Sequence, residues 1–274
     1  MNSFTAIRNN RDASLRSFNV LTNTVPYYLF FWVCILYMNI QRNSFITILS
    51  TRKSGKSFMI AEMIYMFLTN DKDNNCDVMY MFSNTARFEE GGNYEFIDKR
   101  CIFKADIATV DKVVSRLMEL QLKTKKKHHI LLVFDDIDLS AKFDKSIEQL
   151  ATQGRHYNIT TILSAQVATN AISPAIRNNT SYLFIRKLNS ETLKKQIYSM
   201  IISGEFENAE QFKEFINEHN KDYQFIMYDN NADEKGVQIV KATKIPADFK
   251  YVCREGKKEK GTKRVHWTAE KELF

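Results

Sequence analysis

The residues best suited to chemistry form a short polar loop at positions 50–58, directly after an apolar run. Lys56 is long enough to reach the β- and γ-phosphates of a nucleotide, and the Ser57 hydroxyl is a suitable Mg²⁺ ligand. Backbone N–H groups of such a loop, and of the helix after it, bind phosphate oxygens. The loop therefore predicts a site for ATP and Mg²⁺, and the alternative is an exposed basic turn. Its members are Ser50, Thr51, Arg52, Lys53, Ser54, Gly55, Lys56, Ser57 and Phe58.

The loop departs from the usual phosphate-loop pattern at Ser50, where that pattern has a glycine five residues before Gly55. A serine can form the turn, but it lacks the freedom of glycine at positive φ. The tripeptide Gly-Lys-Ser is a weak signal on its own. A strand-like segment at 43–49 and a helix-like segment at 57–68 surround it and strengthen the prediction.

A second chemical motif ends the apolar run at 130–134, where Asp135 and Asp136 follow each other. Such runs are typical of parallel strands that are covered on both faces, and sites in α/β sheets lie at the carboxyl ends of strands. One carboxylate there can hold the Mg²⁺ that Ser57 also touches, and a second can orient or deprotonate the attacking water. The alternative is that both carboxylates cap the next helix.

Strand-like and helix-like segments alternate along the chain, which predicts an α/β fold with a mainly parallel sheet and helices on both faces. Residues 1–43 form an N-terminal extension with an apolar segment, and 44–190 form the core. Residues 191–274 hold two helices, a strand pair and a basic tail. The core strands are expected at 43–49, 78–83, 130–135, 159–164 and 182–186, and the strand pair at 223–228 and 237–240.

The amino-acid composition limits the classes of protein to which this chain can belong. With 44% hydrophobic residues the chain has enough apolar side chains for a core, which excludes global disorder. The formal net charge of +7 favours an acidic partner, such as nucleic acid or an anionic membrane. The four cysteines are scattered without a C-x-x-C pair, which argues against a zinc site or a disulfide framework. The basic run at 254–264 could bind phosphates or could be a solvated tail.

An apolar segment at 25–38 is shorter than the roughly 20 residues that a membrane span needs. Three arginines precede it and aromatic residues lie near both of its ends, but no small-residue cleavage site follows. The protein is therefore expected to be intracellular and not secreted. The segment could be a short membrane anchor, an element packed on the core, or an extension with no role in the core fold.

A third motif lies at 153–166, where a Gly-Arg-His turn and a strand lead to Gln166. Together with Ser-Gly-Lys-Ser at 54–57 and Leu-Leu-Val-Phe-Asp-Asp at 131–136, it resembles the viral genome-packaging ATPases of the poxvirus type. These belong to the FtsK–HerA superfamily and occur in large DNA viruses, virophages and virus-like transposons. The resemblance covers roughly residues 44–190, and the apolar N-terminal segment is not part of the family pattern.

The resemblance implies a P-loop fold and a role for each matching residue. Asp135 would bind the metal, and Asp136 would activate water. An additional strand between the phosphate-loop and carboxylate strands, here 159–164, would bring Gln166 close to the γ-phosphate. Ring ATPases of this kind use an arginine from a neighbouring subunit, for which Arg155 is the first candidate and Arg177 the second, although either could be a structural ion pair.

The function implied by the resemblance is an ATP-driven double-stranded DNA translocase that packages a viral or virus-like genome into a capsid. Its partners would be duplex DNA, further copies in a ring, expected to be a hexamer, and a capsid or portal component. A membrane contact through residues 25–38 is compatible with this function but is not implied by the resemblance. It would act in the cytoplasm or nucleus of an infected cell or in the virion. The basic turn at 123–127 could face DNA phosphates. The alternatives are another P-loop nucleic-acid ATPase, of the helicase or plasmid-transfer type, and a nucleotide-binding scaffold with weak turnover.

Overall fold

The computed structural model describes residues 38–51, 53–69, 75–86, 92–137, 144–166, 172–219, 221–233 and 236–252. The apolar segment at 25–38, apart from Met38, lies outside these ranges, as do Arg52 and the basic run at 254–264. No helix in the described ranges is both long enough and apolar enough to cross a membrane.

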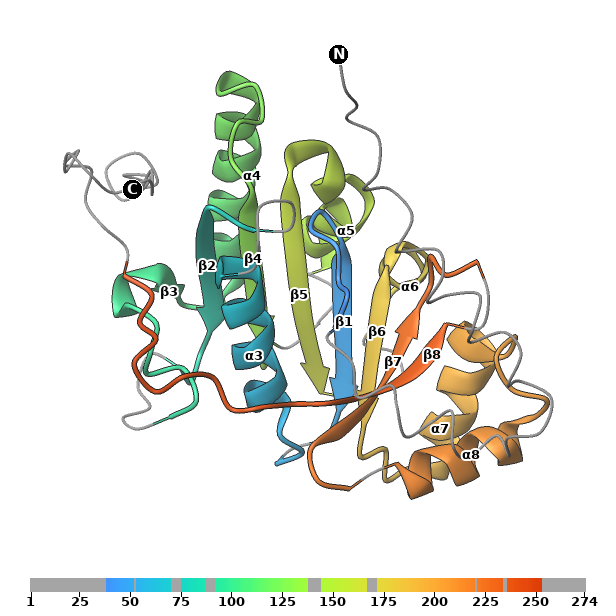
Figure 1. Cartoon of the computed structure of the whole chain (residues 1–274). Helices are drawn as coiled ribbons and strands as arrows, with labels where there is room; N and C mark the ends of the chain where they lie inside the picture. Colours follow the sequence, from blue (N-terminus) through green and yellow to red (C-terminus); the bar gives the residue numbers. More distant parts are fainter. Residues whose placement is uncertain are drawn as a thin grey trace, which may run out of the picture. The chain divides into compact units, whose positions relative to one another are not determined.

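One eight-stranded sheet organises the described chain (Figure 1). Its strand order is β3-β2-β4-β5-β1-β6-β7-β8. Neighbouring strands from β3 to β6 are parallel, whereas β7 and β8 are antiparallel to their neighbours. The strands are β1 (Phe45–Ser50), β2 (Val78–Ser83), β3 (Ile102–Phe103), β4 (Ile130–Asp135), β5 (Ile159–Gln166), β6 (Tyr182–Arg186), β7 (Gln224–Asp229) and β8 (Val237–Lys241).

The parallel α/β sheet predicted from the sequence is confirmed, and β5 lies between β1 and β4 as the resemblance implies. The sheet is larger than the predicted set of about five strands. The C-terminal strand pair joins it, because β7 pairs with β6 along the whole register from Tyr182–Asp229 to Ile185–Ile226. The two-residue strand β3 adds the eighth member at the other edge.

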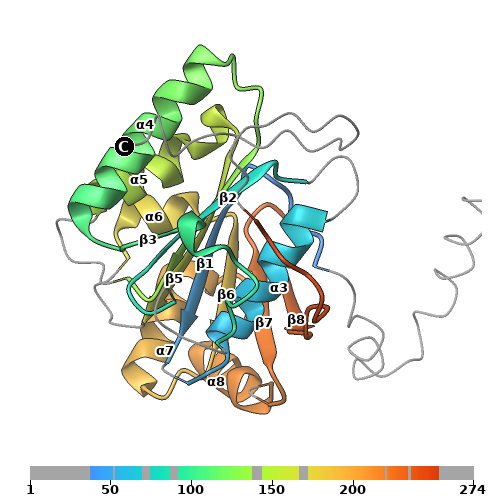
Figure 2. The same ribbon diagram turned by 90° about the vertical axis from the view of Figure 1, so that its left-hand side faces the viewer.

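Helices cover both faces of the sheet (Figure 2). Helix α3 lies on one face, and α4, α5, α6, α7 and α8 lie on the other, each group packing into its own apolar clusters. The bounds are α3 (Lys56–Thr69), α4 (Ile107–Lys123), α5 (Asp144–Gln153), α6 (Pro174–Asn179), α7 (Glu191–Ile197) and α8 (Ala209–Glu218), with short 3-10 turns η1 (Lys99–Cys101) and η2 (Gly154–Tyr157) and a π-helical turn η3 (Tyr198–Ile202).

The central strand β1 shows why the sequence folds this way. All six of its residues are buried, because Ile46 and Ile48 face α3 while Phe45 and Leu49 pack against the helices of the opposite face. An uninterrupted apolar strand is what a doubly covered parallel sheet requires. Helix α3 buries the positions that repeat at three- and four-residue spacing, which are Met59, Ile60, Met63, Ile64, Phe67 and Leu68.

The chain ends its described course as a strap, residues 242–252, that crosses α3 from β8 towards β2 (Figure 1). The backbone N–H and hydroxyl of Thr243 donate to the Glu62 carboxylate on α3, at 2.8 and 2.5 Å. At the far end the Tyr251 hydroxyl accepts from the Met79 N–H at 2.8 Å and donates to the Met79 carbonyl at 3.3 Å. The strap therefore covers α3 and hydrogen-bonds the edge of β2 at Met79, beyond the two residues of β2 that pair with β3.

The Tyr251 hydroxyl gives a test of the strap. We expect Tyr251→Phe to lower the free energy of unfolding by about 1–2 kcal/mol, because it leaves the Met79 N–H without its partner. Urea denaturation followed by circular dichroism measures the change. Tyr65→Phe is the matched control, since the Tyr65 ring packs on Phe249 of the strap at 4.9 Å and should retain that contact. Equal stability of wild type and Tyr251→Phe would contradict a stabilising role for the strap end.

Candidate active site

The predicted site residues meet at the edge of the sheet formed by the carboxyl ends of the parallel strands. Ser50 at the end of β1 is in register with Gln166 of β5 on one side and with Arg186 of β6 on the other. Asp135, at the end of β4, is in register with Ser83 of β2. Five strand ends thus bring polar residues to one edge of the sheet, which is where α/β sheets bind ligands.

The phosphate loop turns at Lys53 and Gly55, whose φ angles are 54° and 90°. Ser50 is still a strand residue and is not among the residues with positive φ, so a serine at this position carries no strain from the missing glycine. The Ser54 hydroxyl donates to the Ser50 hydroxyl at 2.9 Å and closes the loop. Helix α3 then begins, and the Gly55 carbonyl accepts from the N–H groups of Phe58 and Met59.

Lys56 lies at the first position of α3 and is 8% exposed. Its Nζ is 3.8 Å from Oδ1 of Asp136, and it makes no hydrogen bond within the described chain. Asp136 follows β4 with a φ of 54°, and its side chain is 36% exposed. A buried ammonium group without a hydrogen-bond acceptor fits a phosphate, which would supply both charge and acceptor oxygens.

Asp135 is almost completely buried. Its Oδ2 accepts a hydrogen bond from the Tyr94 hydroxyl at 2.7 Å, while its Oδ1 has no hydrogen-bond partner in the described structure. Burial raises the pKa of Asp135 above its ordinary range, and the Tyr94 hydrogen bond and the Lys56 charge oppose that rise. Such an oxygen fits a divalent cation that prefers oxygen ligands, and Ser57 at the second position of α3 offers a hydroxyl for the same ion.

Two further loop residues and Gln166 complete the predicted set. Thr51 follows β1 directly, and Phe58 lies in the first turn of α3, where its ring packs against Tyr223 with centroids 5.2 Å apart. Gln166 is the last residue of β5, beside Ser50 in the register, so its backbone lies next to the start of the phosphate loop. Arg52 lies outside the described residues.

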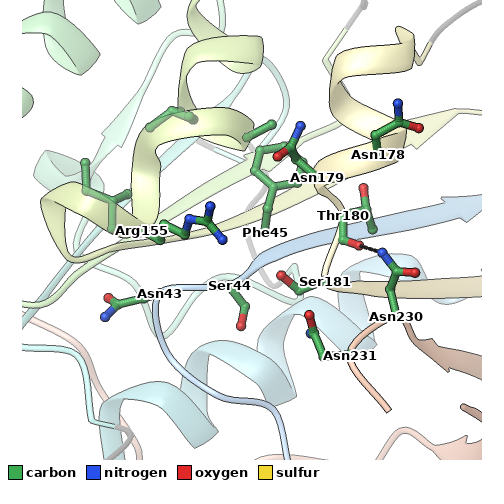
Figure 3. Close-up of a pocket in the computed structure, with 13 residues that line it drawn as sticks. Asn43, Ser44, Phe45, Arg155, Asn178, Asn179, Thr180, Ser181, Asn230 and Asn231 are labelled. Atoms are coloured by element: carbon green, nitrogen blue, oxygen red, sulfur yellow. Dashed lines mark hydrogen bonds between the residues drawn. The ribbon is translucent and has the colours of Figure 1, made fainter. Parts of the chain in front are cut away.

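The two candidate arginines do not join this group. Arg155 lies in η2, just before the amino end of β5, at the sheet edge opposite to the phosphate loop. It lines a polar cavity of about 110 Å³ together with asparagine, serine and threonine residues at the amino ends of β1 and β6 (Figure 3). In that cavity the Asn230 side-chain amide donates to the Thr180 carbonyl at 3.2 Å.

Arg177 lies in α6, on the face of the sheet opposite to α3, because its neighbour Ile176 packs in the cluster formed by α4 and α5. Its guanidinium contacts the Ile172 carbonyl at 3.5 Å and the Met200 sulfur at 3.3 Å. In the described residues neither Arg155 nor Arg177 has an ion-pair partner, so the structural ion pairs considered from the sequence are not seen for these two arginines.

Three residues at the site were missed by the sequence analysis. Tyr94 comes from an irregular stretch with no periodic signal, and Tyr223 precedes β7 in a turn. Arg186 did carry a signal, because it is a charged residue at the carboxyl end of an apolar strand, the same pattern that identified Asp135.

Comparison with known proteins identifies the family. The model of the family described as "Poxvirus A32 protein" matches residues 96–263, which is more than half of the chain. The chain belongs to the poxvirus A32 protein family. The match begins after the phosphate loop. It contains both carboxylates of the site, Gln166 and the two candidate arginines.

Two further viral proteins are similar to this chain. "Uncharacterized protein 075L" of Invertebrate iridescent virus 6 is 26% identical over 234 residues, which cover 79% of this chain and 84% of that protein. "Uncharacterized protein L437" of Acanthamoeba polyphaga mimivirus is 24% identical over 205 residues, or 70% and 69% of the two chains. The resemblance to viral packaging ATPases of the poxvirus type, which the three motifs predict, is confirmed.

Solved structures show the same fold. B204, the DNA-packaging ATPase from Sulfolobus Turreted Icosahedral Virus, superposes with a TM-score of 0.52 at 19% identity, covering 76% of this chain and 100% of B204. The pCW3 conjugation coupling protein TcpA, solved with ATPγS, gives 0.56 at 14% identity over 79% of this chain and 65% of its own. At these identities the likeness concerns the fold. The chain thus combines membership of the A32 protein family with the fold of B204 and TcpA.

The buried Asp135 gives a test of the site that needs no ligand. Because burial raises its pKa, the folded chain holds the proton more tightly than the unfolded chain, and stability falls as the pH rises through the interval between the two pKa values. We expect Asp135→Asn to raise the melting temperature at neutral pH in EDTA, by about 2–4 °C for each kcal/mol of desolvation removed. The gain should vanish below about pH 3, where the carboxyl group is neutral in both the folded and the unfolded state.

Differential scanning calorimetry across this pH range measures the effect. Asp136→Asn is the matched control, because the Asp136 side chain is 36% exposed and its substitution should change the melting temperature less. A melting temperature of Asp135→Asn below that of the wild type at neutral pH would show that the Asp135 carboxylate stabilises the fold, contrary to this expectation.

Proposed function

We propose that the protein is an ATP-driven translocase of double-stranded DNA that packages a viral or virus-like genome into a capsid. The observation that carries the proposal is the phosphate loop whose Lys56 lies 3.8 Å from Asp136, beside the buried and half-satisfied carboxylate of Asp135. The A32 family match and the fold shared with the packaging ATPase B204 support it. The fold shared with the genome packaging NTPase B204 of Sulfolobus turreted icosahedral virus 2, solved with AMPPCP, at a TM-score of 0.50, supports ATP as the nucleotide.

Each residue has a distinct task in this proposal. Lys56 and the loop N–H groups bind the phosphates, and Ser57 and Asp135 hold Mg²⁺, which supplies charge that neutralises the phosphate oxygens when it is bound. Asp136 is the better candidate for contact with water because its side chain is 36% exposed and Asp135 is buried. It orients the attacking water and accepts its proton. Gln166 at the end of β5 contacts the γ-phosphate end of the nucleotide.

A ring of identical subunits accounts for the position of the two arginines. Arg155 lies at the opposite edge of the sheet from its own phosphate loop, and Arg177 lies on the face away from α3. A head-to-tail interface, which closes into a ring, would bring one of these arginines to the loop of the next subunit. An arginine supplied in this way stabilises the charge of the transition state. A hexamer is the ring size that we propose.

Contacts with DNA are proposed to involve phosphates. The end of α4 and the turn after it present four exposed lysines before β4 begins, which are Lys123, Lys125, Lys126 and Lys127. Lysines at such a turn bind the backbone of a duplex without reading its sequence, and their binding weakens as the salt concentration rises. A capsid or portal component is the expected protein partner, and residues 25–38 are the proposed place of any membrane contact. The place of action is the infected cell or the virion.

Hydrolysis of ATP by the whole chain, with and without duplex DNA, tests the proposal directly. We expect turnover that rises when DNA is added. Lys56→Ala should lower kcat/KM about 100-fold or more because it removes a phosphate-binding charge. Asp136→Asn should lower kcat by about 10²–10⁴-fold because it removes the base. Lys145→Ala, an exposed lysine of α5, is the matched control and should keep full activity.

Three outcomes would contradict parts of this proposal. Unchanged turnover in both variants would place the chemistry elsewhere. Nucleotide binding without turnover would leave the scaffold alternative. Separation of the strands of a forked duplex, without displacement of a third strand from an intact duplex, would favour a helicase over a packaging translocase.

The arginine assignment can be tested by mixing inactive variants. Arg155→Ala or Arg177→Ala keeps the phosphate loop, and Lys56→Ala keeps both arginines. If the finger acts on the next subunit, a one-to-one mixture assembled into rings restores about a quarter of the wild-type sites, because each such site combines one intact loop with one intact arginine. Turnover of the mixture, compared with each variant alone, measures this. Recovery with neither arginine variant would exclude both from the role.

A further inference from the structure

Arg186 is a buried cation beside the phosphate loop that the proposed chemistry does not use. It is 7% exposed, and its Nε and Nη1 have no hydrogen-bond partners within the described chain. Its strand neighbours Tyr182 and Phe184 belong to the cluster on the α3 face, so the alternation of β6 directs Arg186 to that same face. Burial of unpaired guanidinium donors is costly, which indicates that acceptors for them come from outside the described chain.

The Arg186 guanidinium is stacked on aromatic rings next to the loop. Its central carbon lies over the Tyr223 ring at 5.1 Å and over the Phe225 ring at 5.3 Å. Tyr223 in turn packs on Phe58 in the first turn of α3, with ring centroids 5.2 Å apart. A Cβ atom added to Gly55 would come within 2.9 Å of the Tyr223 ring. Tyr223 therefore lies against the phosphate loop, even though it comes from the turn before β7.

Tyr223 is held there at a conformational cost. Asp222 and Tyr223 are consecutive non-glycine residues with positive φ angles of 46° and 62°. Half of the Tyr223 surface is exposed, although the residue is a large aromatic one. Strained backbone of this kind clusters at active sites and ligand-binding positions. With the guanidinium over one side of the ring, the exposed half is available for a second flat partner.

The direction of a bound nucleotide follows from the sheet order. Lys56 leans towards Asp136 at the end of β4, whereas Arg186 and Tyr223 belong to β6 and the turn before β7, across β1 from β4. A triphosphate whose γ-phosphate end lies at Lys56 and Asp136 therefore has its sugar and base on the side of β6 and β7. On that side lie the exposed aromatic ring of Tyr223 and the planar guanidinium of Arg186, whose Nε and Nη1 have no hydrogen-bond partners within the described chain.

We propose that Tyr223 is the stacking platform for the base of the bound nucleotide and that Arg186 donates to the oxygens of its ribose. This inference rests on the proposed nucleotide function of the phosphate loop and adds the residues that hold the nucleoside. Stacking on an aromatic ring does not depend on the identity of the base, because every base has a π face. The site should therefore hold ATP and GTP with similar affinity. The cation over the other face of Tyr223 also fixes the orientation of the ring.

Calorimetric titration of the full chain with ATP, GTP and inorganic tripolyphosphate, each with Mg²⁺, tests the inference. Tripolyphosphate has the phosphates but neither base nor ribose. We expect Tyr223→Ala to raise the Kd for ATP and for GTP about tenfold and to leave the Kd for tripolyphosphate unchanged. Tyr223→Phe is the matched control, because it keeps the ring and should keep all three affinities. Arg186→Lys should weaken ATP and GTP, again without an effect on tripolyphosphate.

The same titrations separate this inference from the proposed function. If the wild type binds none of the three ligands, the loop is not a nucleotide site and both proposals fail. If all three ligands bind and Lys56→Ala abolishes their binding, but Tyr223→Ala leaves the Kd for ATP unchanged, the loop assignment stands and the platform is overturned. A loss of tripolyphosphate affinity in Tyr223→Ala equal to the loss for ATP would also overturn it, since the residue would then act through the loop.

Discussion

The pairing of β1 with β5 on one side and β6 on the other is the constraint on which the site depends. Because all three strands run parallel, their carboxyl ends meet, and the register sets Ser50 between Gln166 and Arg186. The phosphate loop can then turn onto the α3 face, where Lys56 lies within 3.8 Å of Asp136. A shift of one residue in either pairing would turn Arg186 or Gln166 to the opposite face of the sheet. The chemistry is thus a consequence of strand register more than of any single loop conformation.

The parts of the structure that depend on neighbouring residues could be predicted from the sequence. Apolar runs and the turn chemistry of Gly55-Lys56 predict the strands, the loop and the carboxylates, because each signal lies within a few neighbouring residues. Tyr94 and Tyr223 could not be found in this way. Tyr94 reaches Asp135 from an irregular segment 41 residues earlier, and Tyr223 reaches Gly55 through the antiparallel pairing of β7 with β6. Such contacts depend on tertiary structure, for which the sequence of one chain carries no periodic signal.

Several buried polar atoms at the site lack hydrogen-bond partners within the described chain, which is unfavourable for stability. Lys56 Nζ, Asp135 Oδ1 and two nitrogens of Arg186 are buried at the same edge without hydrogen-bond partners in the described chain. Buried polar groups of this kind are rare in folded proteins, and each lowers stability. Their concentration at one edge indicates that the fold gives up stability there so that charged groups are already in place for a ligand. Burial of the apolar clusters on the two faces of the sheet offsets the cost of these unpaired groups in the free energy of folding.

The strap over α3 has a consequence for the order in which the protein folds. It joins Tyr251 to Met79, which are 172 positions apart in the chain, so it can dock only after both β2 and α3 are in place. Contacts of such long sequence separation form slowly, because the entropy of closing the loop is lost before the contact forms. During that interval the outer side of α3 lacks its cover. The strap, rather than the helix beneath it, is therefore expected to be among the last segments to gain protection from hydrogen exchange during refolding.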